Sequence, residues 1–288
     1  MRFPRWTLFP LALALVLAAA APAWARVAGK VAFVHRAAVY VKQTATPRAA
    51  AVRVSGVRPA RFAAITQDGR QVVWSTRGTA IDLRVRRSTA SGPARRYSLP
   101  GTGSSVTPTW FGASGLRIGF IASNYTHGGS AARDRLGWML GDGSGARLTF
   151  EAPAGSIDRR KLSWGANGML FAMQPAGSSF RDLYAYRPGN DTLVRITDAQ
   201  SAGHTSYSQA VWSRGGAMIA AVVDGNLVVM EADGSNEVIG PSGRSPAFSP
   251  DGRTLAYIRA ADGRVRAIST DFTFRRGLLR ATASDVSW

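Results

Sequence analysis

The chain has 288 residues, with 36 Lys and Arg against 17 Asp and Glu, a net charge of +19 and no Cys. Without Cys it has neither disulfides nor a lipid-bearing Cys, so packing and closure must stabilise an exported form. Nearly all the basic residues are Arg in an Ala- and Gly-rich chain, and they form no dense block. This pattern does not favour nucleic-acid binding.

The first 25 residues are typical of a secretory signal peptide. Arg2 and Arg5 precede an apolar run from Leu8 to Ala21, and Ala23–Ala25 has the small-x-small pattern of a cleavage site. The run is shorter than the roughly 20 residues of a membrane-spanning helix. We expect export to the periplasm or the medium, no membrane span, and a mature domain at residues 26–288. Loss of two Arg with the leader lowers the net charge to +17.

The remaining residues have the pattern of short strands separated by tight turns. Apolar or alternating runs occur at Gln71–Trp74, Leu183–Tyr186, Met218–Val223, Asn226–Met230 and Leu255–Ile258. Asp-Gly pairs, which accept the positive φ angles of hairpin turns, recur between such runs. No long helical periodicity follows the leader. The sequence therefore predicts an all-β fold.

A repeat underlies these strands. Each unit has an aromatic or apolar residue that ends one strand, then a turn glycine, then a second apolar strand. The turn glycines are Gly69, Gly115, Gly168, Gly216 and Gly252, separated by 46, 53, 48 and 36 residues. Intervals of this size are typical of four-stranded propeller blades.

The two ends of the chain complement each other in this pattern. Asp285–Trp288 repeats only the opening strand of a unit, and Val31–Val34 begins a run of further strands. Two unpaired sheet edges would favour aggregation. We therefore expect these segments to pair in one shared blade, which closes a ring of six four-stranded antiparallel blades.

Two segments resemble a known family. Pro246–Tyr257 (PAFSPDGRTLAY) and Met230–Asn236 (MEADGSN) are similar to the WD40-like repeat of the TolB-like β-propeller family. The resemblance implies a six-bladed propeller in the bacterial periplasm that binds other proteins. TolB itself has an additional N-terminal α/β domain, for which we expect no counterpart here, so the resemblance does not imply membership of the Tol–Pal system.

Aromatic residues share one position of the repeat. They are Trp110, Trp164, Trp212, Phe248 and Trp288. They could form a ring of binding aromatics, but large apolar groups at a fixed repeat position usually pack between repeats, and we expect packing here.

Motifs for catalysis are absent from the sequence. The three His residues have no metal-ligand spacing, and neither a nucleophile elbow nor a phosphate-binding loop occurs. We therefore expect no catalytic residues, no metal and no cofactor.

The long connections indicate where a partner would bind. By strand order, the longest ones fall on one face of the propeller, at Ser123–Asp134, Phe150–Arg160, Gln174–Arg181 and Asp198–Ser208. Loops carried by rigid strands commonly bind, and aromatic and Arg side chains commonly anchor interfaces. The candidate partner-binding residues are Asn124, Tyr125, His127, Arg133, Arg159, Arg160, His204 and Tyr207. These connections could equally be tolerated insertions.

Two functions remain open at this stage. The first is a monomeric protein-binding scaffold of the cell envelope whose partner is an envelope protein or an anionic envelope polymer, since a basic chain attracts acidic partners. The alternative is a metal-dependent hydrolase of the lactonase type with its site in the central channel. Acidic residues that converge in the channel would favour the alternative.

Overall fold

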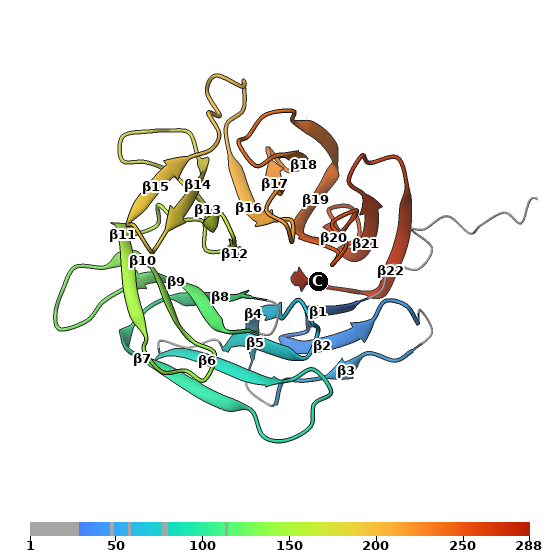
Figure 1. Cartoon of the computed structure of the whole chain (residues 1–288), viewed down its shortest axis with the longest axis horizontal. Coiled ribbons are helices and arrows are strands. Elements are labelled where there is room, and N and C mark those ends of the chain that lie inside the picture. Colours follow the sequence, from blue (N-terminus) through green and yellow to red (C-terminus); the bar gives the residue numbers. More distant parts are fainter. Residues whose placement is uncertain (1–28, 47–48, 57–58, 77–79, 113–114) are drawn as a thin grey trace, which may run out of the picture.

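A computed structural model describes residues 29–46, 49–56, 59–76, 80–112 and 115–288, without the side chains of residues 80 and 81. The leader expected at residues 1–25 lies outside this part. The described residues form 23 β-strands and no helix, and thus no helix able to cross a membrane. The sheets are arranged around a central axis, and the C-terminus lies next to that axis (Figure 1). The all-β prediction is confirmed.

Four sheets have four antiparallel strands each. Sheet 1 contains β23 (Asp285–Ser287), β1 (Lys30–His35), β2 (Ala38–Gln43) and β3 (Val52–Arg53). Sheet 2 contains β4 (Ala60–Ile65), β5 (Gln71–Thr76), β6 (Ala80–Arg87) and β7 (Arg95–Thr102). Sheet 3 contains β8 (Ser105–Phe111), β9 (Arg117–Tyr125), β10 (Arg133–Leu140) and β11 (Arg147–Pro153). Sheet 4 contains β12 (Ser163–Gly165), β13 (Gly168–Met173), β14 (Asp182–Arg187) and β15 (Thr192–Arg195).

Sheet 5 has seven strands because one long strand serves two groups. It contains β16 (Tyr207–Trp212), β17 (Met218–Val223), β18 (Asn226–Glu231), β19 (Val238–Phe248), β20 (Thr254–Arg259), β21 (Arg264–Ser269) and β22 (Arg275–Thr282). β19 pairs with β18 up to Ser242 and with β20 from Gly243 onward. Division of β19 at this point gives six groups of four strands. The count of six blades depends on that division and remains our interpretation.

The chain ends close the ring as the sequence predicts. β23 pairs antiparallel with β1, with Ser287 opposite Ala32 and Asp285 opposite Val34. The C-terminal strand is therefore the innermost strand of sheet 1, and the N-terminal strands complete that sheet. β1 is thus paired on both sides, with β23 and with β2, and its edge is not open to association with another chain.

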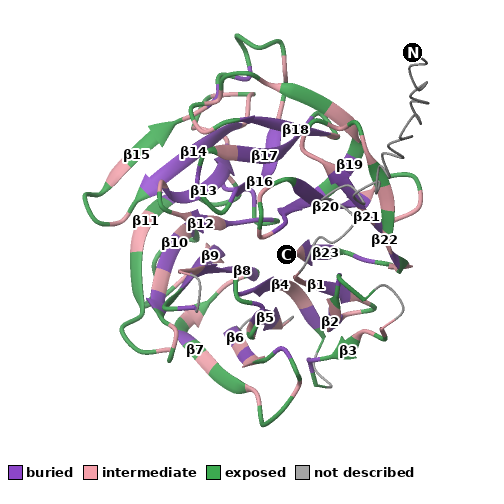
Figure 2. Cartoon of the chain, turned by 45° about the vertical axis from the view of Figure 1, so that its right-hand side comes forward, coloured by how far each residue is buried: buried purple, intermediate pink, exposed green. Residues whose placement is uncertain are grey.

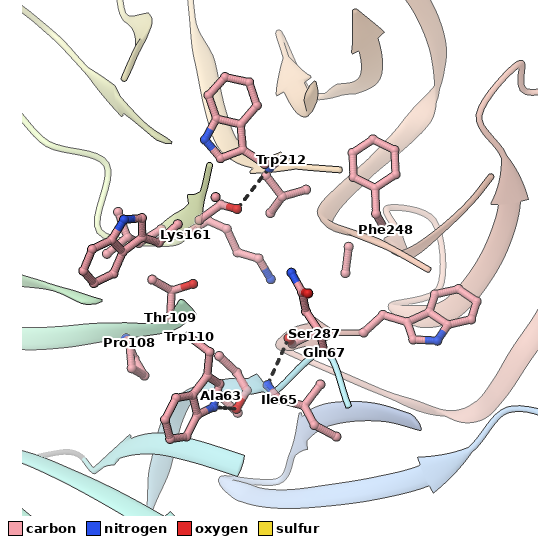
Figure 3. A pocket seen from close by; sticks show the side chains of 18 of the residues that line it. Ala63, Ile65, Gln67, Pro108, Thr109, Trp110, Lys161, Trp212, Phe248 and Ser287 are labelled. Carbon is pink, nitrogen blue, oxygen red and sulfur yellow. Dashed lines mark hydrogen bonds between the residues drawn. The ribbon is translucent and has the colours of Figure 1, made fainter. Parts of the chain in front are cut away.

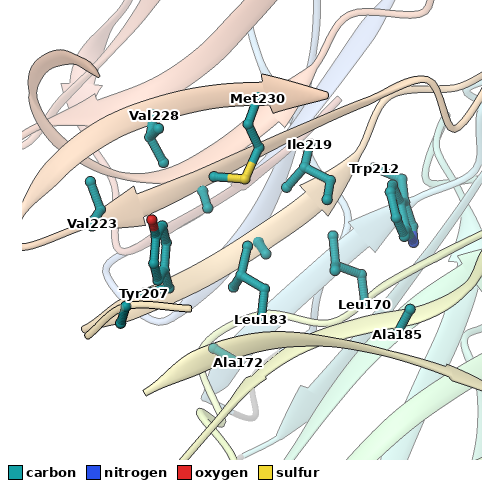
Figure 4. Close-up of a cluster of buried hydrophobic side chains, with 13 residues drawn as sticks. Leu170, Ala172, Leu183, Ala185, Tyr207, Trp212, Ile219, Val223, Val228 and Met230 are labelled. Atoms are coloured by element: carbon teal, nitrogen blue, oxygen red, sulfur yellow. The ribbon is translucent and has the colours of Figure 1, made fainter. Parts of the chain in front are cut away.

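The hydrophobic core lies between successive groups of strands. Inner and middle strands are mostly buried, whereas outer strands such as β7 and β15 are largely exposed (Figure 2). Six buried clusters occur among the described residues, each between neighbouring groups. In one, Leu170 and Leu183 of sheet 4 meet Ile219 and Met230 of sheet 5 (Figure 4). Each group of strands thus buries both of its faces against its two neighbours.

The turn glycines of the repeat have the backbone conformation that their position requires. Gly216 and Gly252 have φ angles of 73° and 71°, in the left-handed region that non-glycine residues rarely adopt. Each joins the innermost strand of a group to the second strand, as the spacing predicts. The innermost two strands therefore turn tightly on one face, called here the tight-turn face.

The innermost strands carry irregularities at their other ends. The register of β16 against β17 shifts between Ser208 and Val211, and that of β19 against β20 shifts between Arg244 and Ala247. Gln209 and Ser245, inside these shifts, have φ angles of 53° and 55°. A bulge leaves backbone N–H groups without ladder partners, so other acceptors must bind them. For Gln209 and Ser245 these acceptors are the side chains of Asp158 and Gln209.

Candidate functional site

The central channel is the first candidate site. It is lined by the innermost strands β4, β8, β12, β16, β19 and β23, and it contains a cavity of about 110 Å³ (Figure 3). Every group of strands therefore contributes to its wall. In a ring of this kind a ligand bound at the axis would contact all the groups at once, so the channel lining decides what the axis can bind.

Aromatic side chains surround the channel at the tight-turn face. Trp110, Trp164, Trp212, Phe248 and Trp288 line the cavity and are all buried. The Trp110 indole N–H donates to the Ala64 carbonyl, and the Trp212 indole N–H donates to the Gly168 carbonyl, in each case on the preceding sheet. Their rings thus join neighbouring sheets, and the prediction of packing between repeats is confirmed.

Trp164 shows how closely the sheets approach. A Cβ on Gly119, in the second strand of the preceding sheet, would lie 2.9 Å from the Trp164 ring. Glycine is therefore the residue that lets this indole lie flat against β9. The Trp164 ring also stacks on Phe111 with 4.7 Å between centroids. These contacts hold the ring in the interface between sheets 3 and 4.

A buried ion pair crosses the middle of the channel. Lys161 precedes β12 in sheet 4, and its Nζ lies 3.3 Å from Asp285 Oδ1 and 2.5 Å from the Val286 carbonyl, both on β23 of sheet 1. Lys161 and Asp285 are only 8 % and 4 % exposed. In Figure 3 the Lys161 side chain extends into the centre of the ring. The pair therefore spans the channel and links sheet 4 to sheet 1, which are not neighbours in the ring.

Asp285 binds more than Lys161. Its Oδ2 accepts from the Ala63 N–H at 3.0 Å, and its Oδ1 accepts from the Ser245 hydroxyl at 2.6 Å. The Ser245 hydroxyl in turn accepts from the Val286 N–H at 3.3 Å. A buried charge is stable only when it is paired and hydrogen-bonded, and this carboxylate is both. Asp285 thereby joins sheets 1, 2, 4 and 5.

Similar bonds connect the two bulged strands of sheet 5 to each other and to sheet 4. The Gln209 N–H donates to Asp158 Oδ2 at 3.2 Å, and the Ser245 N–H donates to Gln209 Oε1 at 2.7 Å. Asp158 lies in the connection from sheet 3 to sheet 4 and is buried. The backbone groups freed by the bulges are thus satisfied by side chains of the preceding group of strands.

The remaining junctions use side chains in the same way. The Thr107 hydroxyl donates to the Arg159 carbonyl between sheets 3 and 4, and Arg61 Nη1 donates to the Ser104 carbonyl at 3.1 Å between sheets 2 and 3. Each neighbouring pair around the axis therefore has at least one side-chain hydrogen bond. We call this set, with the Lys161–Asp285 pair, the central ring.

The chemistry of the channel follows from this arrangement. Its buried carboxylate at the centre, Asp285, is bound to a lysine, a hydroxyl and a backbone N–H. Over the described part of the chain, no three His, Cys, Asp or Glu side chains converge in a geometry that could hold a metal ion. The central ring is thus suited to holding sheets together.

The eight candidate partner-binding residues are placed differently from one another. His127, Arg133, Arg159 and Arg160 are exposed, and Asn124 and His204 are half-buried. They come from three separate connections on the face opposite the tight turns. Arg160 also pairs with Asp158 at 2.8 Å, and Arg133 lies 3.4 Å from Glu151, so part of their charge is neutralised.

Tyr125 and Tyr207 are core residues, which corrects their assignment as exposed anchors. They are 2 % and 1 % exposed. The Tyr125 hydroxyl donates to the Pro100 carbonyl, and the Tyr207 hydroxyl donates to Glu237 Oε2 at 2.8 Å. Burial raises the pKa of Tyr207, and the hydrogen bond to Glu237 raises it further. Tyr125 is the last residue of β9 and Tyr207 the first of β16, and both side chains are buried. The length of a loop does not indicate whether a side chain at its end is buried.

His204 holds a connection in place. Its Nδ1 lies 3.5 Å from Asp224 Oδ2, and its Nε2 lies 3.2 Å from Glu237 Oε1. Asp224 also accepts from the Thr205 hydroxyl and from the N–H groups of Thr205 and Ser206. Burial acts to raise the pKa of Asp224, but these hydrogen bonds outweigh it and leave the pKa below its usual value. The end of this connection is therefore held rigidly against sheet 5.

Three buried aspartates were not identified from the sequence. Asp82, Asp134 and Asp182 occupy the third strand of sheets 2, 3 and 4 and are almost fully buried. Asp134 accepts from the N–H groups of Asn124 and Ile157, and so fastens both adjoining connections. A leucine one or two residues later in each strand is a sequence signal that could have identified them as a further element of the repeat.

Comparison with known proteins identifies the fold. No family model matches the sequence, and no curated protein matches it. Among solved structures, TolB from Acinetobacter baumannii matches with a TM-score of 0.71 at 17 % identity, over 90 % of this chain and 66 % of that one. The chain thus spans slightly less than two thirds of that TolB chain.

Two further structures agree. A candidate TolB from Agrobacterium tumefaciens matches with a TM-score of 0.63 at 12 % identity, over 88 % of each chain. A chain of a nidogen–laminin complex matches with a TM-score of 0.61 at 10 % identity, over 90 % of this chain and 98 % of that one. The protein is therefore a β-propeller. Its fold is TolB-like; at these identities the likeness shows the fold alone.

Proposed function

We propose that the protein is an exported binding scaffold of the bacterial cell envelope and not an enzyme. The central ring is the main support for this proposal. Asp285 and Lys161, the charged side chains at the centre of the channel, bind other sheets and so hold the ring together. The TolB-like fold supports the envelope assignment, since TolB-like propellers resemble this chain over nearly its whole described length. Partners would then bind at exposed side chains outside the channel.

The lactonase-type alternative requires acidic ligands that converge in the channel. In the described channel the buried acid on β23 is paired with a lysine, and a cation beside a carboxylate opposes the binding of a second cation there. The arrangement therefore favours the scaffold over the hydrolase.

The proposed binding face is the one opposite the tight turns, at His127, Arg133, Arg159 and Arg160, with Asn124 and His204 at its margin. Arg159 is exposed and no carboxylate lies within ion-pair distance of it among the described residues. Such a side chain can contact an acidic surface without first breaking an ion pair. We expect an envelope protein or an anionic envelope polymer to bind here, with affinity that falls as salt rises.

Capture from a bacterial envelope extract tests the scaffold. The mature chain, residues 26–288, is used as bait beside two double reversals with equal change of charge. Arg159→Glu with Arg160→Glu should lose the captured partner. Arg253→Glu with Arg275→Glu should retain it, since these two exposed arginines follow turns of sheet 5 on the tight-turn face.

Equal capture by both variants would contradict the assigned face. Lactone hydrolysis by the purified chain with added calcium would overturn the scaffold itself. Export is tested separately: the N-terminus of secreted material should be Arg26, and an intact Met1 would contradict the leader.

A further inference from the structure

A second hollow lies on the tight-turn face, at the end of sheet 2. It has a volume of about 840 Å³ and receives five basic side chains, which are Lys30, Arg70, Arg86, Arg87 and Arg95. We call it the basic groove. Lys30 begins β1, Arg70 lies in the turn before β5, and the other three lie at the end of β6 and the start of β7. It therefore lies on the face opposite the proposed partner-binding loops.

Neutral groups hold two of these cations. The Lys30 Nζ donates to the Ser88 hydroxyl at 2.9 Å. The Arg86 guanidinium donates to the carbonyls of Gly92 and Val54 at 2.7 and 3.0 Å. Bonds to hydroxyl and carbonyl oxygens fix the position of a cation without cancelling its charge. The groove thus presents preorganised positive charge.

The nearby carboxylates do little to neutralise it. Asp68 lies 3.8 Å from Arg70, but that arginine side chain is 84 % exposed, where an ion pair is weak. Asp142 lies near Arg95, but its carboxylate already accepts from the backbone and hydroxyl of Ser144, which lower its pKa. No ion pair within 4 Å joins Arg86, Arg87 or Arg95 to an acid among the described residues.

Other arginine clusters in the protein are arranged differently. Arg259, Arg264 and Arg266 all lie within 4.0 Å of Asp262, and Arg133 and Arg135 share Glu151. A composition rich in Arg explains how many arginines there are, but it does not explain why the carboxylates accompany some clusters and not this one. The groove therefore has the charge pattern of a site for an anion.

The shape and lining of the groove favour a peptide. Its volume falls toward the upper end of the roughly 300–1,000 Å³ typical of ligand sites. Pro93 and Tyr97 add apolar surface between the cations. Arg95 and Tyr97 belong to β7, the outermost strand of sheet 2, whose other edge has no strand partner within the described chain. An extended segment can use such an edge together with side-chain pockets.

We propose that the basic groove binds an acidic, extended peptide segment of a protein partner. This site is separate from the proposed loop face, and it rests on the proposed function only in that both assume a scaffold. Carboxylates of the segment would contact the five cations, and its apolar side chains would contact Pro93 and Tyr97.

Fluorescence anisotropy with the mature chain tests the proposal. The probe is a short labelled peptide of alternating glutamate and valine, and the control peptide has glutamine in place of glutamate. Arg87→Glu with Arg95→Glu should weaken binding of the glutamate peptide by roughly tenfold or more, because each reversal replaces an attraction by a repulsion. Arg253→Glu with Arg275→Glu makes the same change of charge on sheet 5, outside both proposed sites, and should change the affinity by less than about twofold.

Three results would overturn the proposal. Equal weakening by both variants would mean that net charge alone attracts the peptide. Equal binding of the glutamine peptide would mean that charge is not recognised. Binding of inorganic polyphosphate or phosphatidylglycerol vesicles through Arg87 and Arg95, without peptide binding, would assign the groove to a phosphate-bearing ligand.

The two proposals fail separately. If the peptide does not bind but the envelope partner is still captured through Arg159 and Arg160, the groove assignment is wrong and the scaffold stands. If the peptide binds through Arg87 and Arg95 but the loop-face reversal leaves capture unchanged, the groove stands and the loop face is wrong.

Discussion

Basic side chains occupy both the central ring and the basic groove, but their surroundings differ. At the axis, Lys161 is buried and its charge is met by Asp285 and a backbone carbonyl. In the groove, Arg86 and Lys30 are held by neutral oxygens, and Arg87 and Arg95 are exposed. At the axis the charge of Lys161 is neutralised by Asp285, and the pair holds sheets together. In the groove the positive charge is not neutralised and can attract a ligand.

This comparison indicates that the placement of the few carboxylates is more informative than the excess of arginines. With 17 acidic residues in the whole chain, a carboxylate at the axis or beside an arginine cluster marks where charge serves the fold. Where basic side chains cluster without a carboxylate, they repel one another, and a bound anion would relieve that repulsion. The predictions below test the two halves of this comparison, beginning with the ring.

Deletion of residues 284–288 should have the largest effect on stability. It removes β23, and with it Asp285, the buried Val286 and the buried Trp288. Loss of a buried Trp alone costs about 3–5 kcal/mol, so we expect more than about 5 kcal/mol for the whole strand. Chemical denaturation checks this, with Trp288→Ala as the control that keeps the strand. An unchanged transition would contradict closure of the ring by β23.

Asp285→Asn should have the next largest effect. The substitution keeps the shape of the side chain but leaves the buried Lys161 charge without its partner, which we expect to cost about 3 kcal/mol of unfolding free energy. A second change, Lys161→Met, should restore much of this loss because it removes the unpaired charge. A double-mutant cycle by denaturation measures the coupling. Additive losses would show that the two side chains do not interact.

The ring itself was predictable only in outline. The repeat of Trp212 and Phe248 with the turn glycines predicted the strands, their closure by Asp285–Trp288 and the packing of the aromatics between sheets, because all of these follow from local periodicity. Lys161 and Asp285 were not recognised as a pair. They are 124 residues apart, and only the closed ring brings them together.

The candidate surface was harder to predict for a similar reason. Loop length found the exposed Arg159 but also included Tyr125 and Tyr207, since it says nothing about which way a side chain points. The basic groove was missed because its cations come from four separate elements, β1, the turn before β5, β6 and β7. A charge cluster that forms across several strands leaves no contiguous pattern in the sequence.

Trp212→Phe should cost about 1–2 kcal/mol. It removes the hydrogen bond from the indole N–H to the Gly168 carbonyl and part of the buried ring. Trp164→Phe is the matched control, since within the described structure its indole N–H donates no hydrogen bond. Thermal melting of both variants isolates the contribution of the bond. A larger loss in Trp164→Phe would show that ring volume, and not the bond, joins these sheets.

The groove reversal, Arg87→Glu with Arg95→Glu, should have the smallest effect on stability. Substitutions at exposed positions usually change the unfolding free energy by no more than about 0.5 kcal/mol, and here the removal of like charges offsets other losses. Urea denaturation measures it beside the wild type. A loss comparable to that of Asp285→Asn would mean that the groove arginines serve the fold, and the contrast with the ring would disappear.

Hydrogen–deuterium exchange, with and without the glutamate–valine peptide, tests most directly whether ligands bind at the groove and not at the axis. The account predicts that the peptide slows exchange in the Arg86–Tyr97 hairpin. It also predicts unchanged exchange in β16 and β23 at the axis and in the connection that holds Arg159. Protection at the axis or at that connection, with an unchanged Arg86–Tyr97 hairpin, would contradict it.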